Sequence, residues 1–246
     1  MAPSIHAEPS PDWHRYTTAT EPPGPRSAVV YGAAVPTEES LKLLGNVEGK
    51  RVLDLGCGNG ANAVVLAQQG AKVIGVDPST DRLAAARERA DAAEVRVELH
   101  QANPADLAFL RSDSVDVAIS VMALAEVDDL ARVFRQVHRV LKPEAAFVLS
   151  FPHPAFAMFD PTAEDPLRAA RPYDQSDPVP WSPDGDVMVT DHPRTVGTLF
   201  TTLQRSSFWV DQLLEPTAEG TAGGAGADIA RHVPPTLLFR ARKQGN

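Results

Sequence analysis

The sequence predicts an α/β fold in which helices cover both faces of a mostly parallel sheet. A short apolar run at residues 51–55 ends in closely spaced glycines, and helical spacing follows at once over residues 61–67. Further apolar strands are expected at residues 72–76, 115–120 and 146–151. Strands that alternate with helices in this way are typical of a parallel sheet.

Composition narrows the class of protein. The 246 residues carry 32 acidic and 23 basic side chains, a net charge of -9 that argues against a nucleic-acid partner. No apolar run reaches the roughly 18 residues that cross a bilayer, and the N-terminus lacks signal-peptide features. We therefore expect one cytoplasmic domain without a membrane partner. A single cysteine excludes an internal disulfide and a cysteine-cluster metal site, so no metal is expected.

The glycine turn at residues 56–60 is where a ligand is expected to contact the backbone. Gly56 and Gly58 can take backbone angles that other residues avoid, and without a Cβ they let a small molecule lie on the turn. The helix that follows offers N–H groups to a carboxylate or phosphate. Cys57, inside the turn, is expected to be a small residue in a crowded place rather than a nucleophile.

Two classes of ligand fit this turn. Gly56, Gly58 and Ala61 also have the spacing of a dinucleotide site, so an NAD(P)-dependent oxidoreductase is one alternative. Asp54 favours the other class, because a carboxylate there would repel a pyrophosphate but attract a cation. S-adenosylmethionine carries a sulfonium, an ammonium and one carboxylate. Its carboxylate would sit at the helix start while Asp54 faces its positive end.

The segment VLDLGCGNG resembles the first motif of the class I S-adenosylmethionine-dependent methyltransferases. SVMALAEVDDL and RVLKPEAAFVLS resemble later elements of the bacterial small-molecule branch of that family (methyltransferase type 11/25-like), although Glu144 and Ala145 replace two glycines. The resemblance implies a Rossmann-like, seven-stranded, mostly parallel sheet with an antiparallel last strand. It implies methyl transfer from S-adenosylmethionine to an oxygen, nitrogen or carbon of a small-molecule acceptor. A non-catalytic S-adenosylmethionine-binding protein is the other alternative.

The ends of the second and third strands supply further cofactor candidates. Asp77, followed by Pro78, stands where an acid meets the ribose hydroxyls of a bound nucleoside. By the resemblance, the third strand should end in an acid that accepts a hydrogen bond from the adenine amino group. Asn103 keeps an acceptor oxygen without the charge, and Pro104 has no N–H to donate. Weaker or rearranged adenine contacts are therefore predicted.

Catalytic candidates follow the fourth and fifth strands. By the resemblance, Ser120 and Met122 would border the methionine part of the cofactor, largely through their backbone. Glu126 takes a position often held by histidine, and either a catalytic acid or an exposed helix-start acid fits it. His153 stands between two prolines at the sheet edge that faces the ligand crevice. It is a candidate acid or base, or else a residue that caps the strand end.

Two segments are expected outside the regular fold. Residues 1–34, rich in proline, serine and threonine, are predicted to form an N-terminal arm or lid beside a methyltransferase domain over residues 35–246. The aromatic residues of this arm either close the cofactor pocket or anchor the arm on the core; they are Trp13, Tyr16 and Tyr31, with His14 beside them.

The second segment is an insertion over about residues 153–194, where the composition shifts to proline, aspartate and arginine. It is too long for a plain connection, so it is predicted to be a lid that carries substrate specificity. Tyr173, His192 and Arg194 are the substrate candidates. Salt-bridged surface or helix-end packing is the alternative for these side chains.

The remaining elements are predicted from caps and breakers. A helix is expected after Thr37 with an apolar face that reaches Leu44, and another is capped by Ser79 or Thr80. Lys142-Pro143 ends the helix that begins near Leu130. Thr195 caps a last helix, and two apolar strands follow at residues 208–214 and 236–241, separated by a glycine-rich loop at residues 220–227.

Overall fold

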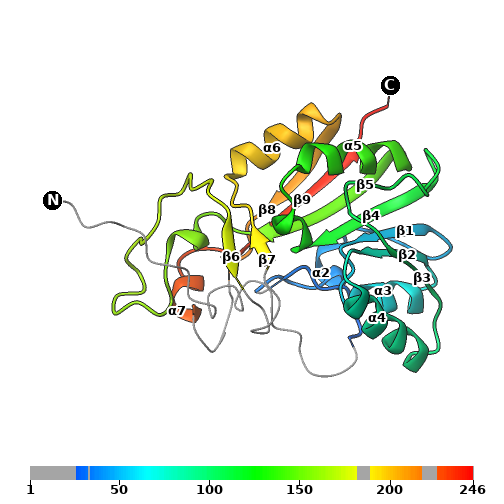
Figure 1. The fold of residues 1–246 in the computed structure, drawn as a ribbon, viewed down its shortest axis with the longest axis horizontal. Helices are drawn as coiled ribbons and strands as arrows, with labels where there is room; N and C mark the ends of the chain where they lie inside the picture. The colour runs from blue at the N-terminus through cyan, green and yellow to red at the C-terminus, as the bar shows by residue number, and fades with distance from the viewer. Residues whose placement is uncertain (1–25, 33, 182–188, 218–225, 246) are drawn as a thin grey trace.

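A seven-stranded sheet forms the centre of the molecule (Figure 1). The structure is a computed structural model and describes residues 26–32, 34–181, 189–217 and 226–245. The strand order is β3-β2-β1-β4-β5-β9-β8. The strands are β1 (Arg51–Leu55), β2 (Lys72–Asp77), β3 (Val97–Gln101), β4 (Val115–Val121), β5 (Leu141–Pro152), β8 (Phe208–Leu214) and β9 (Thr236–Lys243).

The first five strands of this sheet run parallel, and β9 is antiparallel to both of its neighbours, β5 and β8. The predicted sheet, mostly parallel with its last strand inserted antiparallel, is confirmed. The carboxyl ends of the parallel strands therefore meet at one edge, where ligands bind in open α/β sheets.

Helices cover both faces of the sheet (Figure 1), with α5 (Leu130–Val140) and α6 (Val196–Arg205) on one face. The other face carries α2 (Glu38–Leu41), α3 (Ala61–Gln68) and α4 (Thr80–Ala92). Alternate residues of β1 serve two apolar clusters: Leu53 packs in the cluster that holds α5 and α6, and Val52 in the cluster that holds α3. Burial on both faces explains why β1 is a nearly continuous apolar run.

Two of the expected caps are confirmed. The Ser79 hydroxyl accepts a hydrogen bond from the Arg82 N–H at 3.2 Å, and the Thr195 hydroxyl accepts one from the Thr198 N–H at 3.1 Å. In both helices a side-chain oxygen satisfies an N–H that the first turn leaves without a helical partner.

The helix after Thr37 is shorter than predicted. It ends at Leu41, because Lys42 takes a left-handed conformation with φ 51°, and the Thr37 side chain makes no cap. The Glu38 carboxylate instead accepts hydrogen bonds from the Tyr31 hydroxyl and from the backbone N–H groups of the residues after the helix, which are Leu43, Leu44 and Gly45. One carboxylate therefore organises this segment in place of further helical turns.

β5 begins earlier than predicted. The strand starts at Leu141, directly after α5, and includes the expected breaker Lys142-Pro143. Glu144 takes a positive φ of 61°, and the pairing of β4 with β5 shifts register between Val115 and Val117. A bend inside the strand thus replaces the loop that the sequence predicted.

The insertion contains secondary structure of its own. β6 (Val179–Trp181) pairs antiparallel with β7 (Val189–Asp191). The short helix η2 (Phe156–Met158) places Phe156 against Ile229 and Ala230 of α7 (Ala227–Ala230). Since β5 leads directly into this segment, the insertion lies at the carboxyl edge of the sheet (Figure 1).

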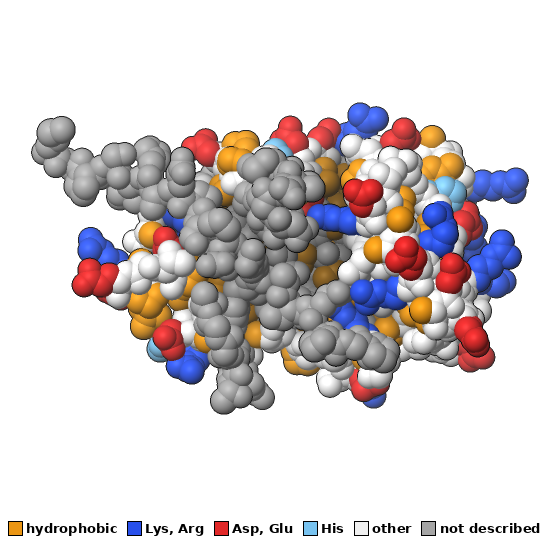
Figure 2. All heavy atoms as spheres, turned by 60° about the horizontal axis from the view of Figure 1, so that its bottom comes forward, with side chains coloured by type: hydrophobic (Ala, Val, Ile, Leu, Met, Phe, Trp, Pro, Cys, Tyr) orange, Lys and Arg blue, Asp and Glu red, His pale blue; other side chains and the backbone are white. Residues whose placement is uncertain are grey.

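The described surface mixes charges of both signs. On the described part of the face drawn in Figure 2, acidic and basic side chains lie next to one another, as on a solvated surface. None of the helices within the described ranges is long and apolar enough to cross a membrane. Trp13 and Tyr16, predicted either to close the pocket or to anchor the arm, lie outside the described residues together with His14, as does most of the loop at residues 220–227.

Candidate active site

The glycine turn between β1 and α3 has one crowded position and one open position. Gly56 and Gly58 both take positive φ angles, 74° and 54°. A Cβ at Gly56 would stand 2.1 Å from the Ala123 Cβ, whereas a Cβ at Gly58 would meet nothing within 4 Å. The backbone at Gly58 is therefore the place where a ligand can lie against the turn.

Asp54 lies beneath this turn at the end of β1. Its side chain is buried, and its Oδ2 atom has no hydrogen-bond partner among the described residues. Burial, and next the neighbouring Asp77 carboxylate, raise the pKa of Asp54 to about 7. A positively charged group placed here would offset both effects, so the geometry fits the cationic end of S-adenosylmethionine.

Asp77 connects the turn to the start of α4. Its Oδ2 accepts a hydrogen bond from the Gly58 N–H at 3.0 Å, and its Oδ1 accepts one from the Ser79 N–H at 2.9 Å. The side chain is almost fully buried. Asp77, the residue predicted to contact the ribose, therefore also fixes the glycine turn.

A cofactor-sized cavity of about 910 Å³, its open mouth included, lies above these strand ends. The predicted cofactor residues that line it are Gly56, Asp77, Pro78, Asn103 and Pro104. Arg82 and Arg132 also line it and were not predicted. Each lies in the first turn of a helix, α4 and α5. For Arg82 the position just after the end of β2 is the signal that would have pointed to it, whereas Arg132 is separated from β4 by η1 and carries no such local signal.

Asn103 uses its acceptor oxygen locally. The Oδ1 atom accepts a hydrogen bond from the Ala105 N–H at 2.8 Å, and the Asn103 backbone carbonyl accepts one from the Asp106 N–H. The side chain is exposed at the cavity rim. Adenine contacts through this amide would require the turn to release it, so rearranged adenine contacts stay a prediction.

The described lining of this cavity does not include the predicted cofactor residues Asp54, Gly58, Ser120, Met122 and Cys57. The Ser120 hydroxyl donates to the Leu55 carbonyl at 2.7 Å and so holds β4 to the end of β1. The Met122 N–H donates to the Ser150 carbonyl at 3.1 Å, and its φ is 60°. The Cys57 thiol is buried, and its Sγ lies 3.0 Å from the place that a Cβ on Gly75 would occupy. These side chains support the turn, and their cofactor contacts stay predictions.

The segment before α2 is fixed by Tyr31 and Asn62. Tyr31 is fully buried and its hydroxyl donates to Glu38 at 2.6 Å. The Asn62 side chain, at the start of α3, accepts from the Val30 N–H at 3.1 Å and donates to the Val30 carbonyl at 2.9 Å. Asn62 was not predicted. Tyr31 thus anchors the chain on the core, which is one of the two roles expected for it.

Glu126 lies in the wall of the cofactor cavity. It ends the short helix η1 (Ala123–Glu126). Burial raises the pKa of its carboxyl group; the charge of Arg82 opposes that shift, while Asp191 and Asp77 add to it. The position leaves the predicted catalytic role open and excludes the alternative of a fully exposed acid.

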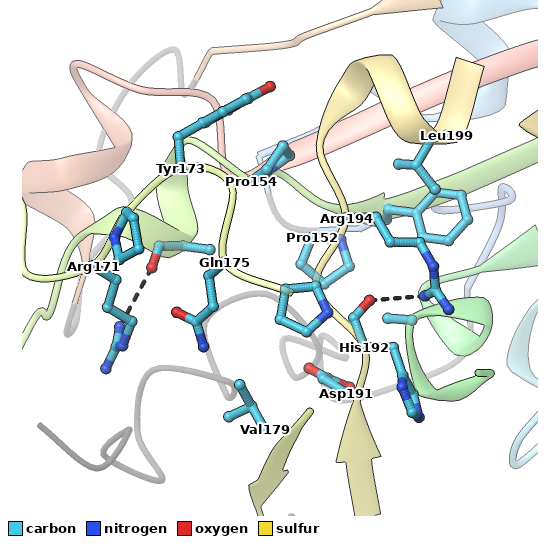
Figure 3. Close-up of a pocket in the computed structure, with 15 residues that line it drawn as sticks. Pro152, Pro154, Arg171, Tyr173, Gln175, Val179, Asp191, His192, Arg194 and Leu199 are labelled. Atoms are coloured by element: carbon cyan, nitrogen blue, oxygen red, sulfur yellow. Dashed lines mark hydrogen bonds between the residues drawn. The ribbon is translucent and has the colours of Figure 1, made fainter. Parts of the chain in front are cut away.

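A second cavity of about 670 Å³, its open mouth included, lies on the other side of η1, beneath the insertion (Figure 3). Tyr173, His192 and Arg194 line it, as do Gln175 and Asp191, which were not predicted. Asp191 directly precedes the predicted substrate residue His192, a signal that would have pointed to it. The cavity joins the ends of β5 and β7 with the insertion, so no single stretch of sequence defines it.

The wall between the two cavities is tied to the insertion by backbone and side-chain hydrogen bonds. The His192 N–H donates to the Ala125 carbonyl at 2.8 Å. The Arg194 guanidinium donates to the carbonyls of His192, Val127 and Asp128 (Figure 3 draws the first of these). Arg194 therefore holds the loop after η1 in place while it borders the second cavity.

His153 uses both ring nitrogens within the protein. Nδ1 accepts a hydrogen bond from the Ala155 N–H at 3.0 Å, and Nε2 lies 2.8 Å from Glu215 Oε1. An Nδ1 that accepts carries no proton, so Nε2 is the nitrogen that donates to Glu215. The ring is buried, and the adjacent Pro152 and Pro154 line the second cavity. A base role would require His153 to give up one of these bonds.

Fold and site together indicate the kind of cofactor that the protein binds. A parallel sheet closed by an inserted antiparallel strand presents a glycine turn, and below that turn a buried carboxylate lacks a partner for one oxygen. This combination suits a nucleoside cofactor with a positive charge.

Comparisons with known proteins identify the family. Residues 53–149 match the family described as "Methyltransferase domain". An S-adenosylmethionine dependent methyltransferase of Mesorhizobium loti shares 32% identity and a TM-score of 0.68, over 82% of this chain and 95% of that one. A Listeria monocytogenes protein assigned to the same class has a TM-score of 0.71 and 28% identity, over 85% of this chain and 96% of that one. The chain belongs to the class I S-adenosylmethionine-dependent methyltransferases.

The curated relatives match over a shorter region. The ubiquinone biosynthesis O-methyltransferase of Pseudomonas syringae is 38% identical over 40% of this chain and 42% of its own length. That of Azorhizobium caulinodans is 32% identical over 42% of this chain and 41% of its own length. This chain thus spans less than half the length of the curated relatives it matches. Family membership selects S-adenosylmethionine over a nicotinamide dinucleotide, and the oxidoreductase alternative is dropped.

Proposed function

We propose that this protein transfers the methyl group of S-adenosylmethionine to a small molecule held in the second cavity. The observation that carries the proposal is the pair of cavities on the two sides of η1. Ala123 and Glu126 face the cofactor cavity, and Ala125, from the same four-residue helix, faces the other. A donor and an acceptor bound in these cavities would be neighbours, and proximity with alignment can supply most of the acceleration of a methyl transfer.

The residues of the chain have separate parts in this proposal. When bound, S-adenosylmethionine supplies an electrophilic methyl group. Asp54 faces the positive end of the cofactor, and Gly58 leaves room for it against the backbone. Glu126 lines the cofactor cavity and directly follows Ala125, which lines the second cavity; from this place its carboxylate, whose pKa is raised by burial, accepts the proton that the acceptor loses. His153, held by its two hydrogen bonds, keeps Pro152 and Pro154 in place in the wall of the second cavity and takes no proton from the acceptor.

The experiment has a binding step and a turnover step. Calorimetry with S-adenosylhomocysteine measures cofactor binding, and mass spectrometry detects the added methyl group on a panel of acceptors. Because the Pseudomonas syringae relative is by name an O-methyltransferase of ubiquinone biosynthesis, the panel includes hydroxylated aromatic compounds beside amines and activated carbon acids. Methyl transfer to any of them supports the proposal. Cofactor binding with no transfer across the panel would favour the non-catalytic binding protein instead.

A further inference from the structure

The inference concerns the chemistry of the acceptor, and it rests on the proposed function. We propose that the second cavity takes an uncharged, largely apolar molecule, and that Gln175 is the residue that recognises its polar group.

The walls of the cavity are mainly apolar and stiff. They include the side chains of Ala125, Phe151, Leu199 and Val179 and the rings of Pro152 and Pro154 (Figure 3 labels four of these). Proline rings have fixed backbone φ angles, so these walls change shape little. Binding an apolar ligand against such walls is favourable, because it removes apolar surface from water.

The two arginines at the cavity donate hydrogen bonds to the protein backbone. Arg171 donates through Nη1 to the carbonyls of Ala157 and Phe159, at 3.4 and 3.3 Å. Arg194 donates through Nη1 and Nη2 to three backbone carbonyls. In Figure 3 a dashed line joins each guanidinium to a backbone oxygen. Both terminal nitrogens of Arg194 are directed at the fold, whereas Arg171 donates to its two carbonyls through Nη1 alone, so for Arg171 the neighbouring carboxylate matters more.

The charges of the two arginines are also balanced by carboxylates of the chain. Asp160 interacts electrostatically with Arg171, and Asp128 and Asp191 interact with Arg194. The His192 ring is likewise paired, with Nδ1 3.6 Å from Asp128 Oδ1. Each cation at the cavity thus already has a carboxylate beside it. A carboxylate, sulfonate or phosphate on the acceptor would lose its hydration there and gain no new ion pair in return.

Gln175 differs from its polar neighbours. The Tyr173 hydroxyl accepts a hydrogen bond from the Val196 N–H at 3.3 Å, whereas the Gln175 amide has no side-chain hydrogen bond to any described residue. In Figure 3 its side chain runs alongside Arg171 toward Val179. An amide both donates and accepts, so it matches a hydroxyl, phenol or carbonyl group. The amide is half-buried and still reached by water, so a ligand that covers it without forming a hydrogen bond would leave it unsatisfied, which makes Gln175 a specificity determinant.

The test of charge uses two fluorescent probes with one skeleton. Phenylnaphthylamine is neutral, and anilinonaphthalenesulfonate adds a sulfonate. With S-adenosylhomocysteine bound, the neutral probe should bind at least about tenfold more tightly. Ala157→Phe, which fills the cavity, should abolish this binding. Equal or tighter binding of the sulfonate, failure of the neutral probe to bind, or binding that survives Ala157→Phe would each overturn the proposal.

The test of Gln175 uses naphthol and naphthalene as competitors of the neutral probe. Wild-type protein should prefer naphthol by roughly tenfold, and Gln175→Leu should remove that preference. Gln69→Leu, an equal change at an exposed position after α3, is the control and should keep it. A preference that survives Gln175→Leu would overturn the role of this residue. Binding of S-adenosylhomocysteine and methyl transfer are measured separately. A failure of the proposed function is therefore distinguishable from a failure of the proposal on acceptor chemistry.

Discussion

Asp54 shows how the fold keeps one residue ready for a charged ligand. Its carboxyl group has a pKa of about 7 in the folded protein against 3.8 for an ordinary aspartate. Between these values the folded state holds a proton that the unfolded state has lost. The stability of the cofactor-free protein therefore falls as the pH rises from about 4 to about 7, since the unfolded state then binds fewer protons.

We expect Asp54→Asn to stabilise the cofactor-free protein at about pH 8 by roughly 2–4 kcal/mol, because it removes an ionised carboxylate that burial disfavours. The same change should weaken S-adenosylmethionine binding. Wild-type affinity should fall below about pH 7, by up to about tenfold per pH unit, as the carboxylate takes up a proton. Urea unfolding and calorimetry over this pH range test both points. A wild-type affinity that is flat below pH 7 would contradict the assigned role.

The two glycines of the turn should respond differently to the same substitution. Gly56→Ala places a Cβ 2.1 Å from Ala123 and should destabilise the protein severely. Gly58→Ala has open space, so its cost should be about 1 kcal/mol from the positive φ. The proposed function places the cofactor against this backbone, so affinity for S-adenosylhomocysteine should drop at least about tenfold when a Cβ is added there. Thermal unfolding and calorimetry separate the two effects. Wild-type affinity in Gly58→Ala would be the contrary result.

His153 provides a test of positioning against base catalysis. Loss of a general base typically costs about 100-fold or more in rate and removes a limb of the pH–rate profile. If His153 only links Ala155 to Glu215 by hydrogen bonds, glutamine should replace it, because the glutamine amide can still donate to Glu215. We expect His153→Gln to keep the wild-type profile and His153→Ala to raise KM and lower Tm. If His153→Gln removes one limb of the pH–rate profile, His153 acts as a general base after all.

How much of the site was predictable depends on where its residues lie in the chain. Asp54 and Asp77 lie in the last residues of β1 and β2, and Gly56 and Gly58 follow β1; all four were found from local pattern, and the structure places them around one turn. Gln175 was missed, because it becomes part of a cavity only when the insertion, β7 included, folds back on the end of β5. Local sequence carries no sign of that arrangement.

At the scale of elements, the start of β5 carries a strained residue. Glu144 stands where the resembling family has the first of two glycines, and its φ is 61°. Glu144→Gly should therefore stabilise the protein by about 0.5–1 kcal/mol, since glycine adopts this conformation without steric cost. Ala145→Gly is the matched control at the second glycine position. It lacks a positive φ and should destabilise by a similar amount. Urea unfolding checks both, and equal responses would contradict the explanation.

The strands were predicted well and two boundaries were not. Strands such as β1 and β4 are buried on both faces, so their apolar runs are visible in the sequence. The helix α2 was predicted too long because the Glu38 carboxylate, not a helical pattern, binds the backbone at Leu43 and Leu44. β5 was predicted too short because a proline normally breaks a strand, and here Pro143 is accommodated beside a bend.

At the scale of the whole molecule, β9 closes the sheet. Leu237, Phe239 and Ala241 of this strand are fully buried, and its backbone pairs with β5 over residues 146–152 and with β8. A chain that stops before Thr236 would leave two sheet edges open, and such edges pair with other chains. We expect it to aggregate on size-exclusion chromatography. A chain that stops after Lys243 retains β9 and should remain monodisperse; equal behaviour of the two would contradict the closing role.

The position of β9 also sets an order for the two cavities during synthesis. The glycine turn, Asp77 and η1 all lie before residue 127, and the strands that hold them pair with one another. The floor of the second cavity, Phe151 and Pro152, pairs with Leu237 and Thr236, which leave the ribosome more than 80 residues later, by subtraction of these residue numbers. A nascent chain should therefore acquire its place for the methyl donor well before it acquires a place for the acceptor.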